Sequence, residues 1–161
     1  MLALPNVAHE HHDVLLPHVE ELAAIARSVG SAPSGDLVRR LAAEHRFITT
    51  HLLPHMDRAE ATIYPEFERL LQNRHSMTPM RREHATLRAL FEELDELRRQ
   101  TMGVEVRHRL RRVLFRMYAM IEVHLAEEES YLAVLERNLS DAELDELARA
   151  MAHPVGDGTE A

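Results

Sequence analysis

Apolar residues recur three and four positions apart along nearly the whole chain, and the alternation typical of strands is absent. This period predicts helices in four long segments joined by short turns, at about residues 6–29, 36–71, 78–100 and 104–137. Pro54 and Pro65 fall inside the second segment and should interrupt it, because proline cannot donate a backbone hydrogen bond. The hydrophobic pattern therefore favours an all-α protein.

A short fifth helix is expected after the last long segment. Ser140-Asp-Ala-Glu143 has the spacing of a capping box, which predicts a helix at about residues 140–152 and a frayed tail over 153–161. Long helices joined by short turns are usually antiparallel neighbours. We therefore predict an up-down antiparallel four-helix bundle over about residues 6–137 with this C-terminal helix added, the 161 residues forming a single domain.

The composition argues against several functional classes. The net charge of -8 disfavours nucleic acid as a partner, because binding to phosphates needs a cationic surface. The 161 residues contain no cysteine, which removes disulfides and thiolate metal sites. No apolar run is long enough to span a membrane, and the N-terminal residues lack the positive and apolar regions of a signal peptide. We expect a cytoplasmic protein that binds neither nucleic acid nor membrane.

Four histidines, one on each long predicted helix, form the strongest chemical pattern in the chain. They are His12, His55, His84 and His124. In an antiparallel pair, residues at equal distance from the connection lie at the same height. The first two lie 18 and 19 residues from the ends of their connection, and the last two lie 16 and 20 residues from theirs. These distances agree within about one helical turn, so the four side chains should lie at one level.

Glu128 follows His124 by four residues, so the two side chains share one face of a helix. Histidines and a carboxylate that converge inside a helical bundle are typical of metal sites. Imidazole suits iron, zinc, copper and nickel, whereas a carboxylate can bridge two hard ions. The donor set favours two irons, joined by an oxo or hydroxo bridge, over one structural zinc, which needs only four ligands. A zinc ion or another single metal is the alternative.

These residues resemble the hemerythrin-like, or HHE cation-binding, family. Its pattern places a His on the first helix of a four-helix bundle, His-x-x-x-Glu on the second, a His on the third and His-x-x-x-Glu on the fourth. The chain matches the fourth part as His124-Leu-Ala-Glu-Glu128 and the second as His55-Met-Asp-Arg-Ala-Glu-Ala-Thr-Ile-Tyr-Pro65. His12 and Glu83-His84 match the other two, so the resemblance covers about residues 9–136.

The second helix departs from the family pattern at one position. Ala59 stands where the resemblance implies a bridging Glu, four residues after His55. Glu60 is the nearest replacement, and His51, which lies one turn before His55, is another candidate ligand. An altered or asymmetric site, or one that holds only one metal firmly, is the corresponding alternative.

The sequence leaves the ligand on the first helix open. Leu15-Leu-Pro-His18 recurs as Leu52-Leu-Pro-His55, and this repeat favours His18 as the ligand. The apolar spacing that follows His12 resembles the spacing that follows His84, and it favours His12. We prefer His12. Two tyrosines, Tyr64 and Tyr131, follow the acidic motifs of the second and fourth helices. Hydrogen bonding near the site is one interpretation of their role, and packing is the one we prefer.

The resemblance implies a non-haem di-iron protein that binds O2 or reacts with a small oxidant such as peroxide or nitric oxide. The implied metal ligands are His12, His55, His84, His124, Glu128 as a bridge, and Glu60 in the role left by Ala59. A carrier and a peroxide-consuming or oxygen-activating enzyme share these ligands, so the sequence does not separate them. Two further hypotheses are an iron- or oxygen-responsive sensor or interaction module with a degenerate or single-metal site, and a helical bundle without metal.

Overall fold

The computed structural model describes residues 4–152, with side chains from residue 12 onward, so the predicted tail over 153–161 lies outside the described residues. No strand occurs in residues 4–152. The helices are α1 (Leu4–Ser28), α2 (Ser34–Phe47), the π-helical turn η1 (Ile48–Leu52), α3 (Leu53–Ala61), α4 (Ile63–Leu70), α5 (Thr78–Arg98), α6 (Val104–Asn138) and α7 (Asp141–Ala152). The prediction of an all-helical fold is confirmed.

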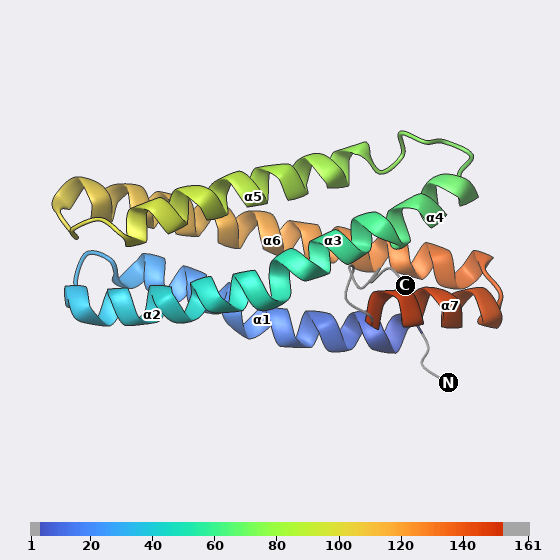
Figure 1. Cartoon of the computed structure of the whole chain (residues 1–161), viewed down its shortest axis with the longest axis horizontal. Helices are drawn as coiled ribbons and strands as arrows, with labels where there is room; N and C mark the ends of the chain where they lie inside the picture. Colours follow the sequence, from blue (N-terminus) through green and yellow to red (C-terminus); the bar gives the residue numbers. More distant parts are fainter. Residues whose placement is uncertain (1–3, 153–161) are drawn as a thin grey trace, which may run out of the picture.

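The long helices lie side by side along the length of the molecule (Figure 1). Helix α6 is the central element, because both α1 and α5 pack along it. Helices α2, η1, α3 and α4 follow one another as a single bent path, and α2 contacts both α1 and α5. Helix α7 turns back from the end of α6 and packs on α1 and α3. The chain is therefore a helical bundle with an added helix near one end.

The second predicted segment is helical but is interrupted at two places, and its two prolines explain both interruptions. Pro54 has no N–H to offer the carbonyl four residues earlier, and the backbone widens into η1 just before it. Pro65 likewise cannot bond to Ala61, and the backbone leaves helical geometry at Thr62, with φ -123° and ψ -64°. The N–H and the hydroxyl of Thr62 both donate to the carbonyl of Arg58 and close the end of α3. Helix α4 therefore does not continue the helical phase of α3.

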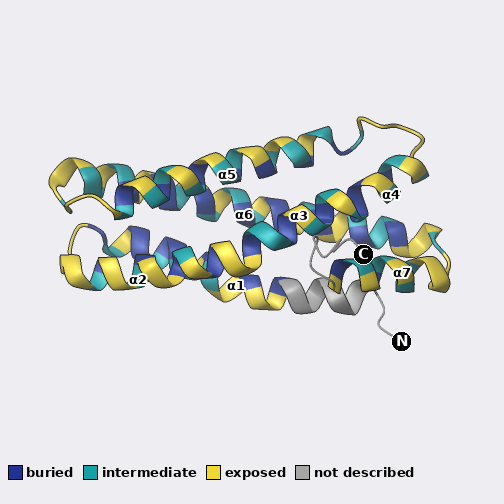
Figure 2. Cartoon of the chain, viewed as in Figure 1, coloured by how far each residue is buried: buried dark blue, intermediate teal, exposed yellow. Residues whose placement is uncertain are grey.

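Two apolar clusters fill the interior, and Figure 2 shows their buried residues on the inward sides of the helices. The larger cluster includes leucines of α5 at helical spacing, namely Leu87, Leu90, Leu94 and Leu97. The smaller cluster joins α7 to the rest of the bundle and includes Ala59, Ile63, Tyr64, Ala148 and Met151. Burial of apolar area at about 25 cal/mol per Å² stabilises both clusters. A layer of buried polar side chains lies between them.

Helix α7 begins with the predicted capping box. The backbone N–H of Ser140 donates to Glu143 Oε2 at 2.8 Å, and the N–H of Glu143 donates to Ser140 Oγ at 3.4 Å. Each side chain thereby satisfies a backbone donor of the other residue at the start of the helix. The capping box is confirmed, and it allows α7 to reverse direction within two residues of the end of α6.

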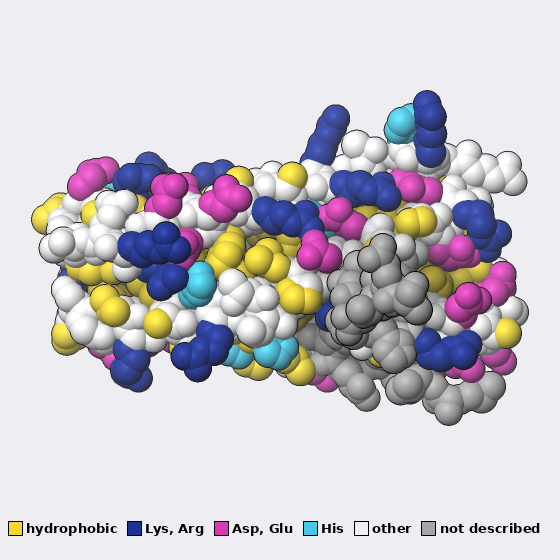
Figure 3. Space-filling model, in the orientation of Figure 1, with side chains coloured by type: hydrophobic (Ala, Val, Ile, Leu, Met, Phe, Trp, Pro, Cys, Tyr) yellow, Lys and Arg dark blue, Asp and Glu magenta, His cyan; other side chains and the backbone are white. Residues whose placement is uncertain are grey.

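The surface carries both signs of charge. On the face shown in Figure 3, basic and acidic side chains are interspersed. This face therefore presents no broad cationic area of the kind that attracts phosphate backbones. Within the described structure, ion pairs such as Arg88 with Asp57, at 2.6 Å, combine the two signs directly. Within residues 4–152, no helix is both long enough and apolar enough to cross a membrane.

Candidate metal centre

Five ionisable side chains are buried between the two apolar clusters. They are His12 from α1, His55 from α3, His84 from α5, and His124 and Glu128 from α6, each at most 2% exposed. Helical spacing places them in this layer. His84, for example, is flanked on its own helix by Met80 of the smaller cluster and Leu87 of the larger one. Buried groups of this kind are costly unless each is paired or binds an ion.

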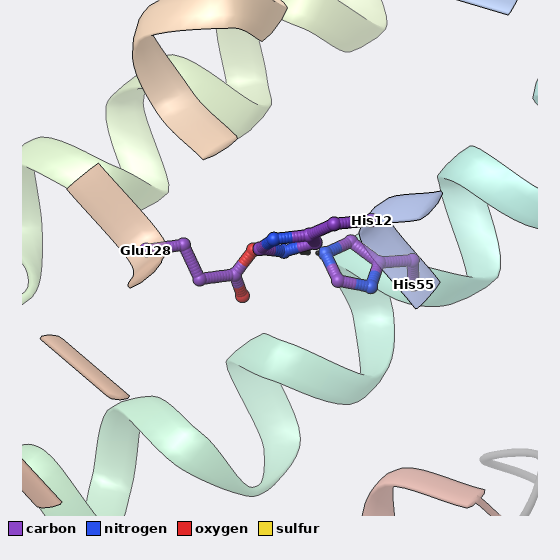
Figure 4. A group of neighbouring side chains, drawn as sticks. All are labelled: His12, His55 and Glu128. Atoms are coloured by element: carbon purple, nitrogen blue, oxygen red, sulfur yellow. Dashed lines mark hydrogen bonds and ion pairs between the residues drawn. The ribbon is translucent and has the colours of Figure 1, made fainter. Parts of the chain in front are cut away.

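The first set of donors converges on one carboxylate oxygen. Glu128 Oε2 lies 2.9 Å from His55 Nε2 and 3.3 Å from His12 Nε2, and Figure 4 shows both rings pointing at the carboxylate. A ligand atom from each of the three residues lies within 4.8 Å of the others. Helices α1, α3 and α6 thus bring two imidazole nitrogens and one carboxylate to a single point.

The second set is a pair of imidazoles that face each other. His84 Nε2 and His124 Nε2 lie 2.9 Å apart. Each ring is held from behind, because His84 Nδ1 donates to Glu60 Oε1 at 2.7 Å and His124 Nδ1 donates to Glu83 Oε2 at 2.8 Å. Both Nε2 atoms therefore present lone pairs to the same point. Metal-bound histidines have this arrangement, with the distal nitrogen on a carboxylate.

The charge of Glu128 links the two sets. Burial raises the pKa of this carboxyl, but the charge of His55 and hydrogen bonds from His12 and His55 outweigh burial and hold it well below its ordinary value. Its Oε1 atom is buried and has no hydrogen-bond partner among the described residues. The same carboxylate also influences the titration of His84 and Tyr64 across the layer. Glu128 is thus ionised, with one oxygen shared by two imidazoles and the other available.

The spacing of the donor atoms fits a metal ion. Metal bonds to nitrogen and oxygen ligands are about 2.1 Å long, so two ligands at right angles lie about 3 Å apart. The contacts within the layer, 2.9 Å and 3.3 Å around Glu128 and 2.9 Å between His84 and His124, match this separation. An ion placed in each set would also satisfy the facing lone pairs of the two imidazoles and the unpartnered oxygen of Glu128.

The structure places the other candidate ligands outside this layer. Glu60 lies behind His84, where its Oε1 accepts hydrogen bonds from His84 Nδ1 and from Arg88. Its pKa is lowered because these two hydrogen bonds outweigh the effect of partial burial. His51 is exposed and stacks on Phe47, with ring centroids 4.9 Å apart. Neither of these two candidate replacements for the missing Glu contacts the facing Nε2 atoms of His84 and His124.

His18, the alternative ligand on the first helix, also lies elsewhere. Its Nδ1 pairs with the buried Glu44 at 3.0 Å, and its ring stacks on Phe47 with centroids 3.5 Å apart. His12 therefore contributes the donor of α1 to the layer, whereas His18 belongs to a separate contact between α1 and α2. Glu44 has a raised pKa, because burial outweighs the hydrogen bond from His18.

Three residues near the donors were not assigned to the site by sequence reasoning. Glu83 and Glu129 contact the outward nitrogens of His124 and His12, at 2.8 Å and 3.3 Å. Their positions next to His84 and Glu128 in the sequence are a signal that could have indicated this role. Tyr64 is fully buried, and its hydroxyl lies 3.1 Å from His84 Nε2. No spacing rule predicts this contact, because the helix breaks at Thr62 between His55 and Tyr64.

Comparison with known families gives one match. The family model described as "Hemerythrin HHE cation binding domain" matches residues 5–135. The chain belongs to the hemerythrin HHE cation-binding family. The matched segment runs from α1 into α6 and contains all five buried donors, whereas α7 lies beyond it. Neither the curated proteins nor the solved structures gave a significant match.

Membership in the hemerythrin HHE family confirms the resemblance inferred from the motifs. The family description indicates a cation-binding domain, and the described structure contains a group of His12, His55 and Glu128 that could hold an ion. The polar layer is therefore the candidate metal centre of this hemerythrin-family chain.

Titration of His84 should destabilise the metal-free chain at acid pH. Burial and the nearby charge of His124 lower the pKa of His84 from 6.5 to about 4. Because the unfolded chain takes up this proton first, the stability contributed by neutral His84 is complete above pH 6.5 and is lost as the pH falls towards 4. Between pH 7 and 5 this loss is about 2 kcal/mol.

Chemical denaturation of the chelator-treated protein at both pH values measures this effect. The matched variant is His84→Gln, which keeps a donor for Glu60 but does not titrate. Its free energy of unfolding should fall by about 2 kcal/mol less than that of the wild type over the same interval. The comparison also cancels the contribution of His12, whose pKa is raised by Glu128 and Glu129 against the effect of burial. An equal or larger fall in the variant would contradict the assignment of a neutral, buried His84.

Proposed function

We propose that this hemerythrin-family chain binds two iron ions in the polar layer. One ion is held by His12, His55 and Glu128, and the other by His84 and His124. The observation that carries the proposal is that His12 and His55 converge on one buried carboxylate, whose second oxygen has no partner in the described structure, while the imidazoles of His84 and His124 face each other in the same layer. A carboxylate in this position suits a bridge between two hard ions.

The surroundings favour a small ligand. The donors are at most 2% exposed and lie between apolar clusters, so water and larger molecules are kept away from them. We infer that the site binds O2 or reacts with a small oxidant such as peroxide or nitric oxide. Bound iron would supply open coordination positions and a change of oxidation state. The carboxylates of Glu60, Glu83 and Glu129 would orient the imidazoles from outside.

The proposal extends to the arrangement of the helices. We propose the up-down antiparallel order of four long helices predicted from the sequence, with the path from α2 to α4 counted as one of them. The packing of α1 and α5 along α6, and the contacts of α2 with α1 and α5, support this order. Location in the cytoplasm stays a prediction from the sequence.

A second candidate function follows from the asymmetry of the layer. The set around Glu128 offers two nitrogens and a carboxylate. In the described structure, the carboxylate of α3 nearest the other set is Glu60, which bonds the outer nitrogen of His84, so Ala59 leaves the facing Nε2 atoms of His84 and His124 without a carboxylate from α3. This observation favours an iron- or oxygen-responsive sensor, or an interaction module, in which only the first set binds a metal firmly. A zinc ion in that set is the corresponding alternative for the cofactor. The number of metals per chain separates these candidates.

The first prediction concerns metal content. Protein from iron-replete cells, or reconstituted anaerobically with Fe(II), should contain about two irons per chain by elemental analysis. His124→Ala should lose at least one of them, because it removes one of two imidazoles from the second set. The control is His51→Ala, which changes an exposed histidine outside the layer and should retain both. One metal in the wild type would instead support the single-metal candidate, and none would contradict iron binding.

The second prediction concerns reactivity. Addition of O2, peroxide or nitric oxide to the Fe(II)-loaded chain should change its optical spectrum, because binding of a small ligand to iron or oxidation of the iron alters its absorption. Repeated consumption of peroxide with retained iron would indicate an enzyme, and reversible binding of O2 would indicate a carrier. If the spectrum of the iron-loaded chain responds to none of the three, the proposed reactivity is contradicted, whereas metal binding is not.

The third prediction separates two roles for Glu60. If Glu60 orients His84 from outside, Glu60→Ala should weaken iron binding by about 10–100-fold yet still bind two irons when the metal is in excess. The control is Glu66→Ala on α4, where the side chain pairs with Arg69 away from the layer. Loss of one iron even at saturating metal would show that Glu60 is itself a ligand, as the resemblance implies.

A further inference from the structure

Tyr64 is the one fully buried tyrosine, and its hydroxyl lies inside the polar layer. The side chain is 0% exposed, and its hydroxyl oxygen is 3.1 Å from His84 Nε2. The phenol ring also stacks on the His84 ring, with centroids 5.4 Å apart and an interplanar angle of 28°. Both contacts fix the oxygen at the inner edge of the imidazole.

That inner edge is the one that faces His124. The outer nitrogen of His84 is occupied by Glu60, so Nε2 is free to act as an acceptor or ligand. The same Nε2 atom contacts both His124 Nε2, at 2.9 Å, and Tyr64 Oη, at 3.1 Å. These separations match the spacing of about 3 Å between neighbouring ligands on one ion. Donor atoms from α4 and α6 therefore both lie at ligand spacing from one donor atom of α5, His84 Nε2.

We propose that the phenolate oxygen of Tyr64 is a further protein ligand of the ion held by His84 and His124. The assignment rests on the proposed function, in which a second iron occupies this set and Glu128 bridges the two ions. Tyr64 would give this second ion an anionic oxygen ligand of its own, in addition to its two imidazole nitrogens and the bridge. A hard ferric ion favours such an oxygen donor.

The local backbone explains how Tyr64 reaches this position. The helix breaks at Thr62, so α4 begins in a new phase and the ring of Tyr64 turns towards α5. Ala59, one turn after His55, carries only a methyl group and lies in the same apolar cluster as Tyr64. The hydroxyl of Tyr64 thus reaches His84 Nε2, an atom that the α3 carboxylate of Glu60 does not contact.

Binding is a ligand exchange without electron transfer. The phenol oxygen would replace a water molecule on the iron, its O–H bond would break, and the released water would carry the proton to solvent. In the metal-free chain burial raises the pKa of the phenol, as do the charges of Glu128, Glu60 and Glu83, so the hydroxyl keeps its proton and donates to His84. A bound cation reverses this local balance, because its positive charge lies next to the oxygen.

The test is the optical signature of a tyrosine bound to ferric iron. The sequence contains three tyrosines, at positions 64, 118 and 131, so each can be removed in turn. The iron-loaded, air-oxidised wild type should show a phenolate-to-iron charge-transfer band in the visible and phenolate vibrations in resonance Raman spectra. Tyr64→Phe should lose both signals. The double variant Tyr118→Phe/Tyr131→Phe, which keeps Tyr64 alone, should retain both.

The outcomes separate the ligand assignment from the proposed function. Iron content is measured on every sample. A wild type with two irons but without the band overturns the role of Tyr64 and leaves the proposed function standing, as does a band that survives in Tyr64→Phe or disappears in the double variant. A wild type without iron contradicts the proposed function and the assignment with it. The wild-type and double-variant spectra decide the question even if Tyr64→Phe does not fold.

Discussion

Burial of ionisable groups in an apolar interior is the constraint on which the rest of this structure depends. Each of the five donors at the centre of the bundle loses its hydrogen bonds to water on burial and needs other partners in their place. Partners within the chain satisfy part of this requirement, since the histidines contact carboxylates or one another. Two groups remain poorly matched within the described structure, the close approach of the two Nε2 atoms and the second oxygen of Glu128. A cation would resolve both, in agreement with the cation-binding description of the family.

The polar layer is organised from the inside outwards. Nitrogen and oxygen atoms that face one another form its centre, and a ring of carboxylates holds the imidazoles from behind. Glu60, Glu83 and Glu129 are partly or largely exposed, so water stabilises their charge at little cost. Arg88 then connects Glu60 to Asp57 at the surface. The geometry of a buried site is thus controlled by residues whose own charges stay hydrated outside the core.

Much of this arrangement was predictable from the sequence because helices have a fixed period. Within each pair of helices the histidines lie at similar distances from the connection, which indicated one level, and the spacing of four placed Glu128 beside His124. The contact of Tyr64 with His84 was not predictable, because the break at Thr62 resets the phase of the helix. The position of Glu60 behind His84 depends on the path of α3 relative to α5, which no local pattern reports. Side-chain positions on regular helices can therefore be predicted from the sequence, whereas those next to an irregular turn cannot.

The π-turn η1 has a consequence for how the chain can vary. The tetrapeptide Leu-Leu-Pro-His occurs twice, yet His18 pairs with Glu44 near the surface while His55 is buried in the layer. Only the second copy is preceded by a π-turn. Such a turn takes up one extra residue, and one residue rotates a helix by about 100°. In a related chain, a one-residue gap within 48–52 would therefore close the π-turn into regular α-helix and leave the same side of α3 facing inward, whereas the same gap in the regular helix on either side would rotate the site.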